Sequence, residues 1–189
     1  MTSREYFDNL YAASGDPWGL AERPYETRKY ALTIAALPAR SYERAFEPGC
    51  SIGVLTEALA HRCTSLIAMD GSNAAVELAG RRLQGQPHVK IRRGVVPADW
   101  PDGEFDLVVL SELLYFLDAA DRKAVAERTA TAIAPGGHLI AVHWRHPFTE
   151  APTNGDVVHA ELAAALRTGF RAVVRHEEPD FLLEVYERE

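Results

Sequence analysis

The segment AFEPGCSIG, from Ala45 to Gly53, constrains the fold of this chain more than any other part of the sequence. It joins the end of an apolar run to a turn of small residues, and an acid, Glu47, stands two residues before the first glycine. A second apolar run ends on Asp70, seventeen residues after Gly53. This order predicts a strand, a tight turn, a helix and a second strand, and the glycines allow the backbone to approach a ligand closely.

The spacing of acids and glycines in this unit is typical of an S-adenosylmethionine (SAM) site. The carboxylate of Asp70 is placed to accept hydrogen bonds from both ribose hydroxyls. The dinucleotide fingerprint Gly-x-Gly-x-x-Gly, aligned on Gly49, needs glycines where this chain has Ser51 and Val54. An ordinary crossover turn without a ligand is the plain alternative. We expect SAM as the cofactor, S-adenosylhomocysteine as its product, and these cofactor-binding residues: Glu47, Gly49, Cys50, Gly53, Asp70, Gly71 and Ser72.

The length and composition of the chain limit the classes of protein that it can belong to. Its 189 residues, 47% of them hydrophobic, suit a single domain over 1–189, with an N-terminal lid or substrate segment (1–38) and a catalytic core (39–189). A net charge of −7 argues against nucleic acid as a partner. No apolar run has the length of a membrane span and no secretory signal is present, so we expect no membrane partner and a cytoplasmic protein.

Strand and helix patterns alternate along the chain, which predicts a largely parallel α/β sheet. The last two strands follow each other across Pro179-Asp180 without a helix, so they should form an antiparallel hairpin. Residues 134–137 (APGG) predict a helix stop and a tight turn. The arrangement resembles the Rossmann-like fold of class I SAM-dependent methyltransferases, with seven strands, a C-terminal antiparallel hairpin and helices on both faces. The predicted strands are 44–47, 66–70, 89–92, 105–110, 138–144, 170–176 and 181–187, and the predicted helices are 24–37, 52–62, 72–83, 121–134 and 157–167.

Ligands of open α/β sheets bind beyond the carboxyl ends of the strands. The third predicted strand leads to Val96, which we expect to pack on the adenine, although a plain hydrophobic strand end is the alternative. The fourth leads to Ser111, a further cofactor-binding candidate, and to Glu112 and Tyr115. We expect Glu112 to face the transferred methyl group or a cationic substrate nitrogen. A solvated acid at the beginning of a helix is the alternative.

The fifth predicted strand ends in the polar and aromatic run His143-Trp144-Arg145-His146. His143 is a candidate proton acceptor near neutral pH, and Trp144 is a candidate stacking surface. A structural role is the alternative for His143 and the expectation for His146. Because no carboxylate or cysteine set has a matching spacing, and the two cysteines of the chain show none either, we expect no metal.

The region before the first strand offers two further cofactor-binding candidates. Trp18 lies in a loop rich in proline and glycine, where a large aromatic side chain is costly unless it packs on something. Pro24 suits the first turn of a helix, on which Tyr25, Arg28 and Lys29 share one face. Arg28 can form a bidentate pair with a carboxylate such as that of SAM. A lid helix with Arg28 in solvent is the alternative.

Several motifs together resemble the nodulation protein S (NodS-like) family of N-methyltransferases over nearly the full chain. They are DPW at 16–18, YETRKY at 25–30, FEPGCSIG at 46–53, the run from Phe105 to Tyr115, and HWRHP at 143–147. The resemblance implies a seven-stranded class I fold and SAM as methyl donor. It also implies that Trp18 and Arg28 contact the cofactor. The acceptor that it implies is an amine on the deacetylated, non-reducing glucosamine of a chitooligosaccharide.

The function expected from the sequence is therefore SAM-dependent N-methylation of a small molecule or an oligosaccharide with a free amine. An attacking amine must be neutral, so the site needs a base. Glu112 and His143 are the candidates for that base, and Tyr115 is the candidate for orienting the amine. An O-methyltransferase of a secondary metabolite would use the same scaffold and stays an alternative. A SAM-binding regulatory module without turnover is the second alternative.

Overall fold

The structure, a computed structural model, describes residues 4–189. Its internal contacts divide these into two compact units, residues 4–95 and residues 96–189, which we call the N-terminal and the C-terminal unit. The single domain predicted over 1–189, with its lid and core segments, stays a prediction. Among the described residues, none of the helices combines the length and the apolar composition needed to cross a membrane.

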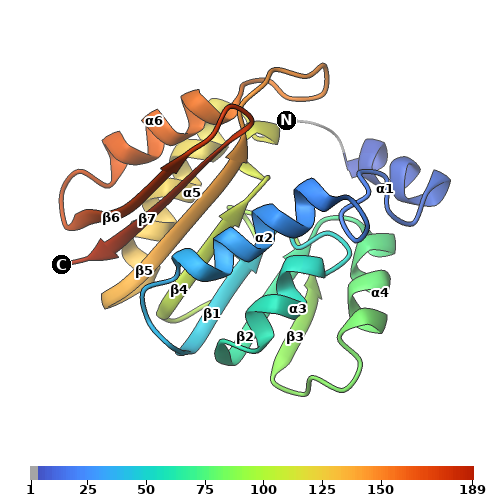
Figure 1. Cartoon of the computed structure of the whole chain (residues 1–189), viewed down its shortest axis with the longest axis horizontal. Coiled ribbons are helices and arrows are strands. Elements are labelled where there is room, and N and C mark those ends of the chain that lie inside the picture. The colour runs from blue at the N-terminus through green and yellow to red at the C-terminus, as the bar shows by residue number, and fades with distance from the viewer. Residues whose placement is uncertain (1–3) are drawn as a thin grey trace. The chain divides into compact units, whose positions relative to one another are not determined.

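The N-terminal unit contains three parallel strands in the order β3-β2-β1. Phe46 pairs with Ile67 and Ala68 with Ile91, so the two predicted strand ends at Glu47 and Asp70 lie at the same edge. α3 packs against β2, and α4 packs against β2 and β3 (Figure 1). The elements are α1 (Arg4–Ala13), α2 (Pro24–Ala36), β1 (Tyr42–Pro48), α3 (Val54–Ala60), β2 (Cys63–Asp70), α4 (Asn73–Arg82) and β3 (Val89–Arg93).

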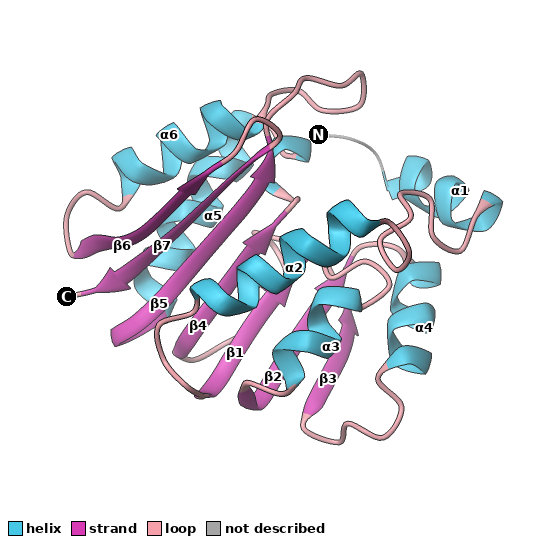
Figure 2. Ribbon diagram, in the orientation of Figure 1, coloured by secondary structure: helices cyan, strands magenta, loops and turns pink. Residues whose placement is uncertain are grey.

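The C-terminal unit contains four strands in the order β4-β5-β7-β6. β4 and β5 are parallel, whereas β7 is antiparallel to both of its neighbours, which confirms the predicted C-terminal hairpin (Figure 2). α6 packs on β5 and β7, and α5 packs on β5 and α6. The elements are β4 (Phe105–Ser111), the short 3-10 helix η1 (Leu114–Phe116), α5 (Ala119–Ala132), β5 (Ile133–Trp144), α6 (Gly155–Ala165), β6 (Phe170–Glu177) and β7 (Phe181–Arg188).

Side-chain caps decide where three of the helices begin. The hydroxyl of Ser72 accepts from the Ala75 N–H in the first turn of α4. Asp118 accepts from the Asp121 N–H at 2.9 Å, and Asn154 accepts from the Val157 N–H at 3.1 Å. These two caps place the beginnings of α5 and α6 two residues earlier than the apolar pattern predicts.

The prediction of a tight turn at residues 134–137 is wrong. These residues lie within β5, which begins at Ile133. Ile133 pairs with Phe105, whereas the next pair joins His138 to Leu107, so β5 contains several extra residues at this point. A bulge of this kind accommodates the glycines and the proline without ending the strand.

Each unit has its own apolar core. The strands contribute most of it, as expected for sheets covered by helices, and each fully buried large side chain contributes roughly 1.5–3 kcal/mol to folding. Fully buried large residues are Tyr42, Phe46, Leu59 and Leu66 in the N-terminal unit, and Phe105, Leu107, Leu110, Leu114, Ile133, Leu139, Ile140 and Phe181 in the C-terminal unit.

Candidate active site

The turn between β1 and α3 is built from backbone groups. The N–H groups of Gly49 and Cys50 both donate to the carbonyl oxygen of Met69, at 2.6 and 3.0 Å, and tie the turn to β2. Gly49 and Gly53 have φ angles of +75° and +81°, in the left-handed region that favours glycine. A Cβ atom on Gly53 would also lie 3.1 Å from Cβ of Ala79 in α4. Both predicted glycines are therefore required by the backbone, and Gly53 also by helix packing.

Asp70 presents an oriented carboxylate at the end of β2. The Ser51 N–H donates to Oδ2 and the Ser72 N–H to Oδ1, each at 2.9 Å. A carboxylate accepts about four hydrogen bonds, so each oxygen retains capacity for a further donor. Burial raises the pKa of Asp70 in spite of these two backbone hydrogen bonds. Gly71 lies between Asp70 and Ser72 in the sequence, and a Cβ on it would approach the Val95 side chain to 3.0 Å.

Glu47 and Cys50 are buried at the base of the same turn. Glu47 is only 2% exposed, and burial raises its pKa to about 8, against a smaller opposing effect of the Thr56 hydroxyl. A neutral carboxyl group both donates and accepts hydrogen bonds. Burial also raises the pKa of the Cys50 thiol, which keeps it protonated and unreactive.

The helix α1, which is absent from the helices predicted above, contacts this turn. The Tyr11 hydroxyl lies 2.5 Å from Oγ of Ser51, and Oγ of Ser72 donates to Oδ1 of Asp8 at 2.7 Å. Apolar side chains at positions 7, 10 and 11 share one helical face, and this spacing would have indicated the helix. Asp8 and Tyr11 are therefore additional residues of the candidate cofactor site.

Trp18 and Arg28, the two cofactor-binding residues predicted before β1, lie in different surroundings. The Asp16 carboxylate accepts from the Leu20 N–H at 2.8 Å, which makes the Asp-Pro-Trp motif a capped turn. Trp18 in this turn packs edge to face on Tyr11, with ring centroids 5.5 Å apart, and so joins the apolar cluster beside the cofactor turn. Arg28 is an exposed residue of α2. The predicted contacts of Trp18 and Arg28 with the cofactor stay predictions.

In the C-terminal unit the chain turns sharply after β4, at Glu112. Its φ of +52° costs a residue with a Cβ roughly 1–2 kcal/mol, and strain of this kind is common at functional sites. The Glu112 N–H donates to the Val142 carbonyl at 2.8 Å. Its Oε2 accepts from the Trp144 N–H at 2.9 Å and from the hydroxyl of Tyr115. The Glu112 carboxylate is thus fixed to β5, directly after the buried Ser111.

Tyr115 belongs to a cluster of three aromatic rings. Its ring contacts those of Phe116 and Phe148 edge-on, with centroids 4.8 and 5.2 Å apart, and the two phenylalanines are 5.6 Å apart. Pairs of this geometry contribute about 0.5–1.5 kcal/mol each beyond their buried area. Because Tyr115 also donates to Glu112, this aromatic cluster forms an apolar surface next to the carboxylate.

His143 is completely buried. Its Nε2 accepts from the Leu114 N–H at 3.3 Å, and its Nδ1 lies 3.2 Å from Nε2 of His159. Both ring nitrogens are therefore engaged inside the C-terminal unit. A base needs a lone pair directed at its substrate, so this geometry favours Glu112 over His143 as the base. The role of His143 as a base stays a prediction.

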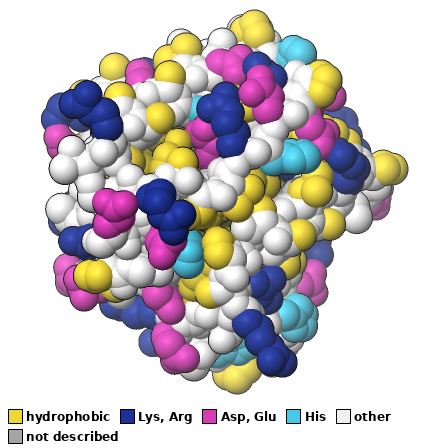
Figure 3. Space-filling view, turned by 60° about the vertical axis from the view of Figure 1, so that its left-hand side comes forward, with side chains coloured by type: hydrophobic (Ala, Val, Ile, Leu, Met, Phe, Trp, Pro, Cys, Tyr) yellow, Lys and Arg dark blue, Asp and Glu magenta, His cyan; other side chains and the backbone are white. Residues whose placement is uncertain are grey.

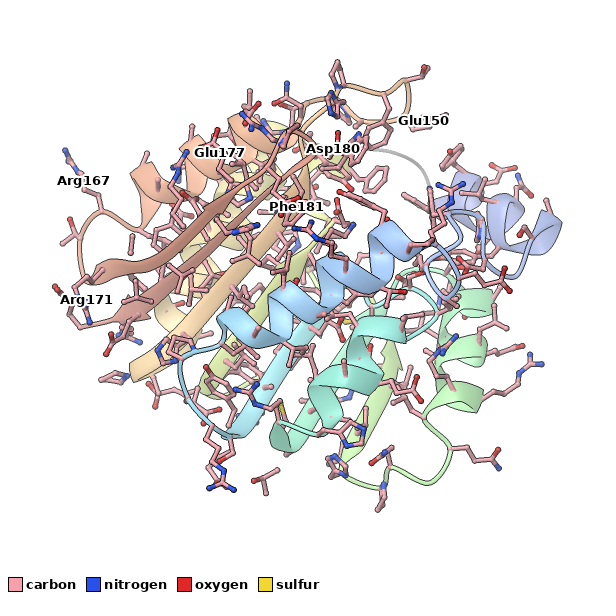
Figure 4. The ribbon with its side chains drawn as sticks, in the orientation of Figure 1. Glu150, Arg167, Arg171, Glu177, Asp180 and Phe181 are labelled. Carbon is pink, nitrogen blue, oxygen red and sulfur yellow. The ribbon has the colours of Figure 1, made fainter. Side chains whose placement is uncertain are left out.

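The loop after β5 is tied to its neighbours by several polar contacts. Nε of Arg145 donates to Asp156 at 2.9 Å, and Nε2 of His146 lies 2.9 Å from Oδ1 of Asp180. Figure 4 shows Asp180 in the β6–β7 hairpin turn and Glu150 on the loop itself. His146 thus contacts the hairpin turn, and its structural role stays a prediction.

Two further predictions concern Val96 and the binding of metal ions. Val96, which was expected against the adenine, is buried at the beginning of the C-terminal unit. Within residues 4–189, no three side chains of His, Cys, Asp or Glu are grouped so that they could hold a metal ion.

Comparison with known proteins gives the family of this chain. Residues 46–141 match the family model described as a methyltransferase domain. Nodulation protein S of Rhizobium tropici is 32% identical over 134 residues, which are 70% of this chain and 56% of that protein. Nodulation protein S of Sinorhizobium fredii is 28% identical over 130 residues, which are 68% of this chain and 60% of that protein. The chain thus spans less than two thirds of the length of these relatives.

Solved structures share the fold. A Pseudomonas syringae protein assigned as a methyltransferase is 45% identical, with a TM-score of 0.77 over 88% of this chain and 100% of that one. The N-methyltransferase NodS of Bradyrhizobium japonicum WM9, in complex with S-adenosylhomocysteine, has a TM-score of 0.84 at 22% identity, over 100% of this chain and 99% of that one. The predicted fold class and the resemblance to NodS are confirmed, and this chain belongs to the methyltransferase domain family and has the class I fold.

Proposed function

We propose that this methyltransferase methylates the nitrogen of a small molecule that carries a free amine, such as an amino sugar. The observation that carries the proposal is the carboxylate of Glu112, which the Trp144 N–H and the Tyr115 hydroxyl hold in place. A fixed carboxylate binds a substrate ammonium group and accepts its proton. The similarity to the N-methyltransferase NodS supports an amine as the acceptor.

The residues of the N-terminal unit fit SAM as the methyl donor. Asp70 retains acceptor capacity for the ribose hydroxyls, and the turn from Gly49 to Gly53 leaves its backbone open to a ligand. Bound SAM supplies a methyl group on a positively charged sulfur. We assign the following further residues to its binding: Trp18, Arg28, Glu47, Cys50, Gly71 and Ser72 in the N-terminal unit, and Val96 and Ser111 in the C-terminal unit.

The acceptor amine has to lose a proton before it can attack, because an ammonium nitrogen has no lone pair. Glu112 takes this proton, and the Tyr115 hydroxyl orients the carboxylate that receives it. Phe116 and Phe148 exclude water beside this pair, which strengthens the attraction between the carboxylate and the cationic substrate. His143 acts indirectly, by holding the backbone of Leu114.

A small cationic acceptor also fits the electrostatics better than a nucleic acid does. The net charge of the chain is −7. On the face drawn in Figure 3, Lys and Arg side chains are interspersed with Asp and Glu side chains. Nucleic-acid binding depends on clustered positive charge, so this surface favours the small-molecule acceptor. Among amines, a deacetylated chitooligosaccharide is the specific candidate that the resemblance to nodulation protein S suggests.

Turnover with a panel of acceptors tests the proposal. Release of S-adenosylhomocysteine is followed with a deacetylated chitooligosaccharide, its fully acetylated counterpart, free glucosamine and a phenol. We expect turnover only with the acceptors that carry a free amine. Turnover with the phenol alone would instead establish O-methylation and overturn the assignment of the amine.

Two substitutions test the residues. Glu112→Gln should lower kcat by roughly 10²-fold or more, since general-base catalysis contributes about 10²–10⁴-fold, and Tyr115→Phe should lower it less. Both variants should bind SAM as the unaltered protein does in isothermal titration calorimetry. Glu127→Gln, which changes an exposed acid of α5, is the matched control and should leave kcat unchanged. An unchanged kcat in Glu112→Gln would remove Glu112 from the mechanism.

A further inference from the structure

A chain of buried polar side chains crosses the C-terminal unit, from β7 to the turn after β4. It consists of Glu184 on β7, His159 on α6 and His143 on β5, which are 5%, 3% and 0% exposed. Nδ1 of His159 lies 2.8 Å from Oε2 of Glu184, and Nε2 of His159 lies 3.2 Å from Nδ1 of His143. The chain ends at the Leu114 N–H, 3.3 Å from Nε2 of His143.

The hydrogens of this chain can be placed from its two ends. The Leu114 N–H can only donate, so Nε2 of His143 carries a lone pair and the hydrogen of the neutral ring is on Nδ1. That hydrogen is donated to Nε2 of His159, which leaves the hydrogen of His159 on Nδ1, facing the Glu184 carboxylate. Every donor then meets an acceptor, and both histidines are neutral with the hydrogen on Nδ1.

The Glu184 end of the chain is fixed by two further donors. The Tyr186 hydroxyl donates to Oε2 of Glu184 at 2.7 Å, and Nη1 of Arg175 donates to Oε1 at 2.7 Å. Burial raises the pKa of Glu184, but the hydrogen bonds from His159 and Tyr186 and the charge of Arg175 outweigh it and lower that pKa overall. Glu184 is therefore an acceptor and not a donor, in agreement with the hydrogen positions.

A glycine at the beginning of α6 allows this helix to bring His159 to His143. A Cβ on Gly155 would collide with the carbonyl oxygen of Trp144 and lie 3.1 Å from Cβ of His143. His159 follows Gly155 by four residues, so both lie on the same face of α6. The close approach of α6 to the end of β5 thus places the two imidazole rings edge to face, with centroids 5.2 Å apart.

We propose that His159 and Glu184 are positioning residues of the acceptor site. Glu184 selects the tautomer of His159, His159 selects that of His143, and His143 holds the Leu114 N–H at the first residue of η1. The same ring of His143 packs edge-on against Tyr115, with centroids 5.5 Å apart. This series of hydrogen-bonded side chains therefore holds the turn that presents the Tyr115 hydroxyl to Glu112. The inference rests on the proposed roles of Glu112 and Tyr115.

The first test reads the hydrogens directly, in the unaltered protein. Long-range ¹H–¹⁵N correlation spectra of the imidazole rings distinguish the two neutral tautomers from each other and from the cation. We expect His143 and His159 both to carry the hydrogen on Nδ1, with the assignment taken from the signals that disappear in His159→Gln. A hydrogen on Nε2 of either ring would overturn the proposal.

The second test separates positioning from general stability. His159→Phe and Glu184→Leu should each lower kcat roughly 10- to 100-fold, because a misplacement of about 1 Å can cost 10²-fold, while SAM affinity stays within about twofold. Glu184→Gln keeps an oxygen that accepts from His159 and should retain most of the activity. Thr129→Val is the matched control and should leave kcat unchanged, because Thr129 is a buried polar residue of α5 that takes no part in the hydrogen bonds from Glu184 to His143.

The outcomes distinguish this inference from the proposed function. If His159→Phe behaves like Thr129→Val while Glu112→Gln loses activity, the positioning role is overturned and the proposed function stands. If Glu112→Gln and Tyr115→Phe both retain full activity, the proposed roles of these two residues fail, and with them this inference, whereas N-methylation itself is decided by the acceptor panel. Should Glu184→Leu not fold, the tautomers in the unaltered protein and the activity of Glu184→Gln still decide.

Discussion

Replacing Gly53 with alanine should destabilise the protein by about 2–4 kcal/mol. The φ of +81° costs a residue with a Cβ roughly 1–2 kcal/mol. The new Cβ would lie 3.1 Å from Cβ and 3.2 Å from Cα of Ala79, and since the Cα belongs to the backbone of α4 it cannot rotate away. Overpacking of this kind costs about 1–3 kcal/mol, and the reduced freedom of the unfolded chain returns about 0.4–1 kcal/mol.

Urea unfolding measures this loss, and Gly80→Ala is the control. Gly80 lies in α4 next to Ala79, but a Cβ there meets no atom within 4 Å, so alanine should stabilise the helix by about 0.5–1 kcal/mol. Gly53→Ala should also weaken SAM binding at least about tenfold in isothermal titration calorimetry, because the turn it distorts carries the amide that orients Asp70. A loss below about 1 kcal/mol with unchanged SAM affinity would refute this reasoning.

Three other predictions follow from single contacts. Asp70→Asn should weaken SAM binding by about 1.5–3 kcal/mol in calorimetry, because the ribose loses its hydrogen bonds to a charged acceptor; unchanged affinity would contradict the ribose assignment. Glu47 loses its proton near pH 4.5 in the unfolded protein but only near pH 8 in the folded one. As the pH rises from 4.5 to 8, the free energy of unfolding of the unaltered protein should therefore fall relative to that of Glu47→Gln, by up to about 1.4 kcal/mol per pH unit. Urea unfolding at several pH values checks this, and a constant difference between the two proteins would contradict it. Arg145→Gln should raise KM for the acceptor and leave SAM affinity unchanged, because it frees the loop after β5; equal changes in both constants would contradict this.

Much of the fold and of the cofactor site follows from local sequence. The strand–turn–helix order around Gly49 and Gly53 is a local property, because the glycines meet a backbone requirement and the apolar runs beside them form buried strands. Asp70 is equally predictable, because β2 runs parallel to β1 and its carboxyl end therefore lies at the same edge of the sheet as this turn. The predicted first residues of the helices are less accurate, because capping side chains such as that of Asp118 lie outside the apolar pattern.

From residue 24 onward, the order of the strands and the longer helices, the family and the cofactor turn all follow from local sequence, because each depends on residues that are close together along the chain. The surroundings of His143, in contrast, depend on how distant parts of the chain fold together. Its direct partners, Leu114 and His159, are 29 and 16 residues away from it in the sequence, and Glu184 lies 25 residues beyond His159. No local pattern joins these residues. A buried acid within the apolar strand β7 was the one visible signal, because burying a carboxylate is costly unless partners compensate for it, and only folding shows which residues those partners are.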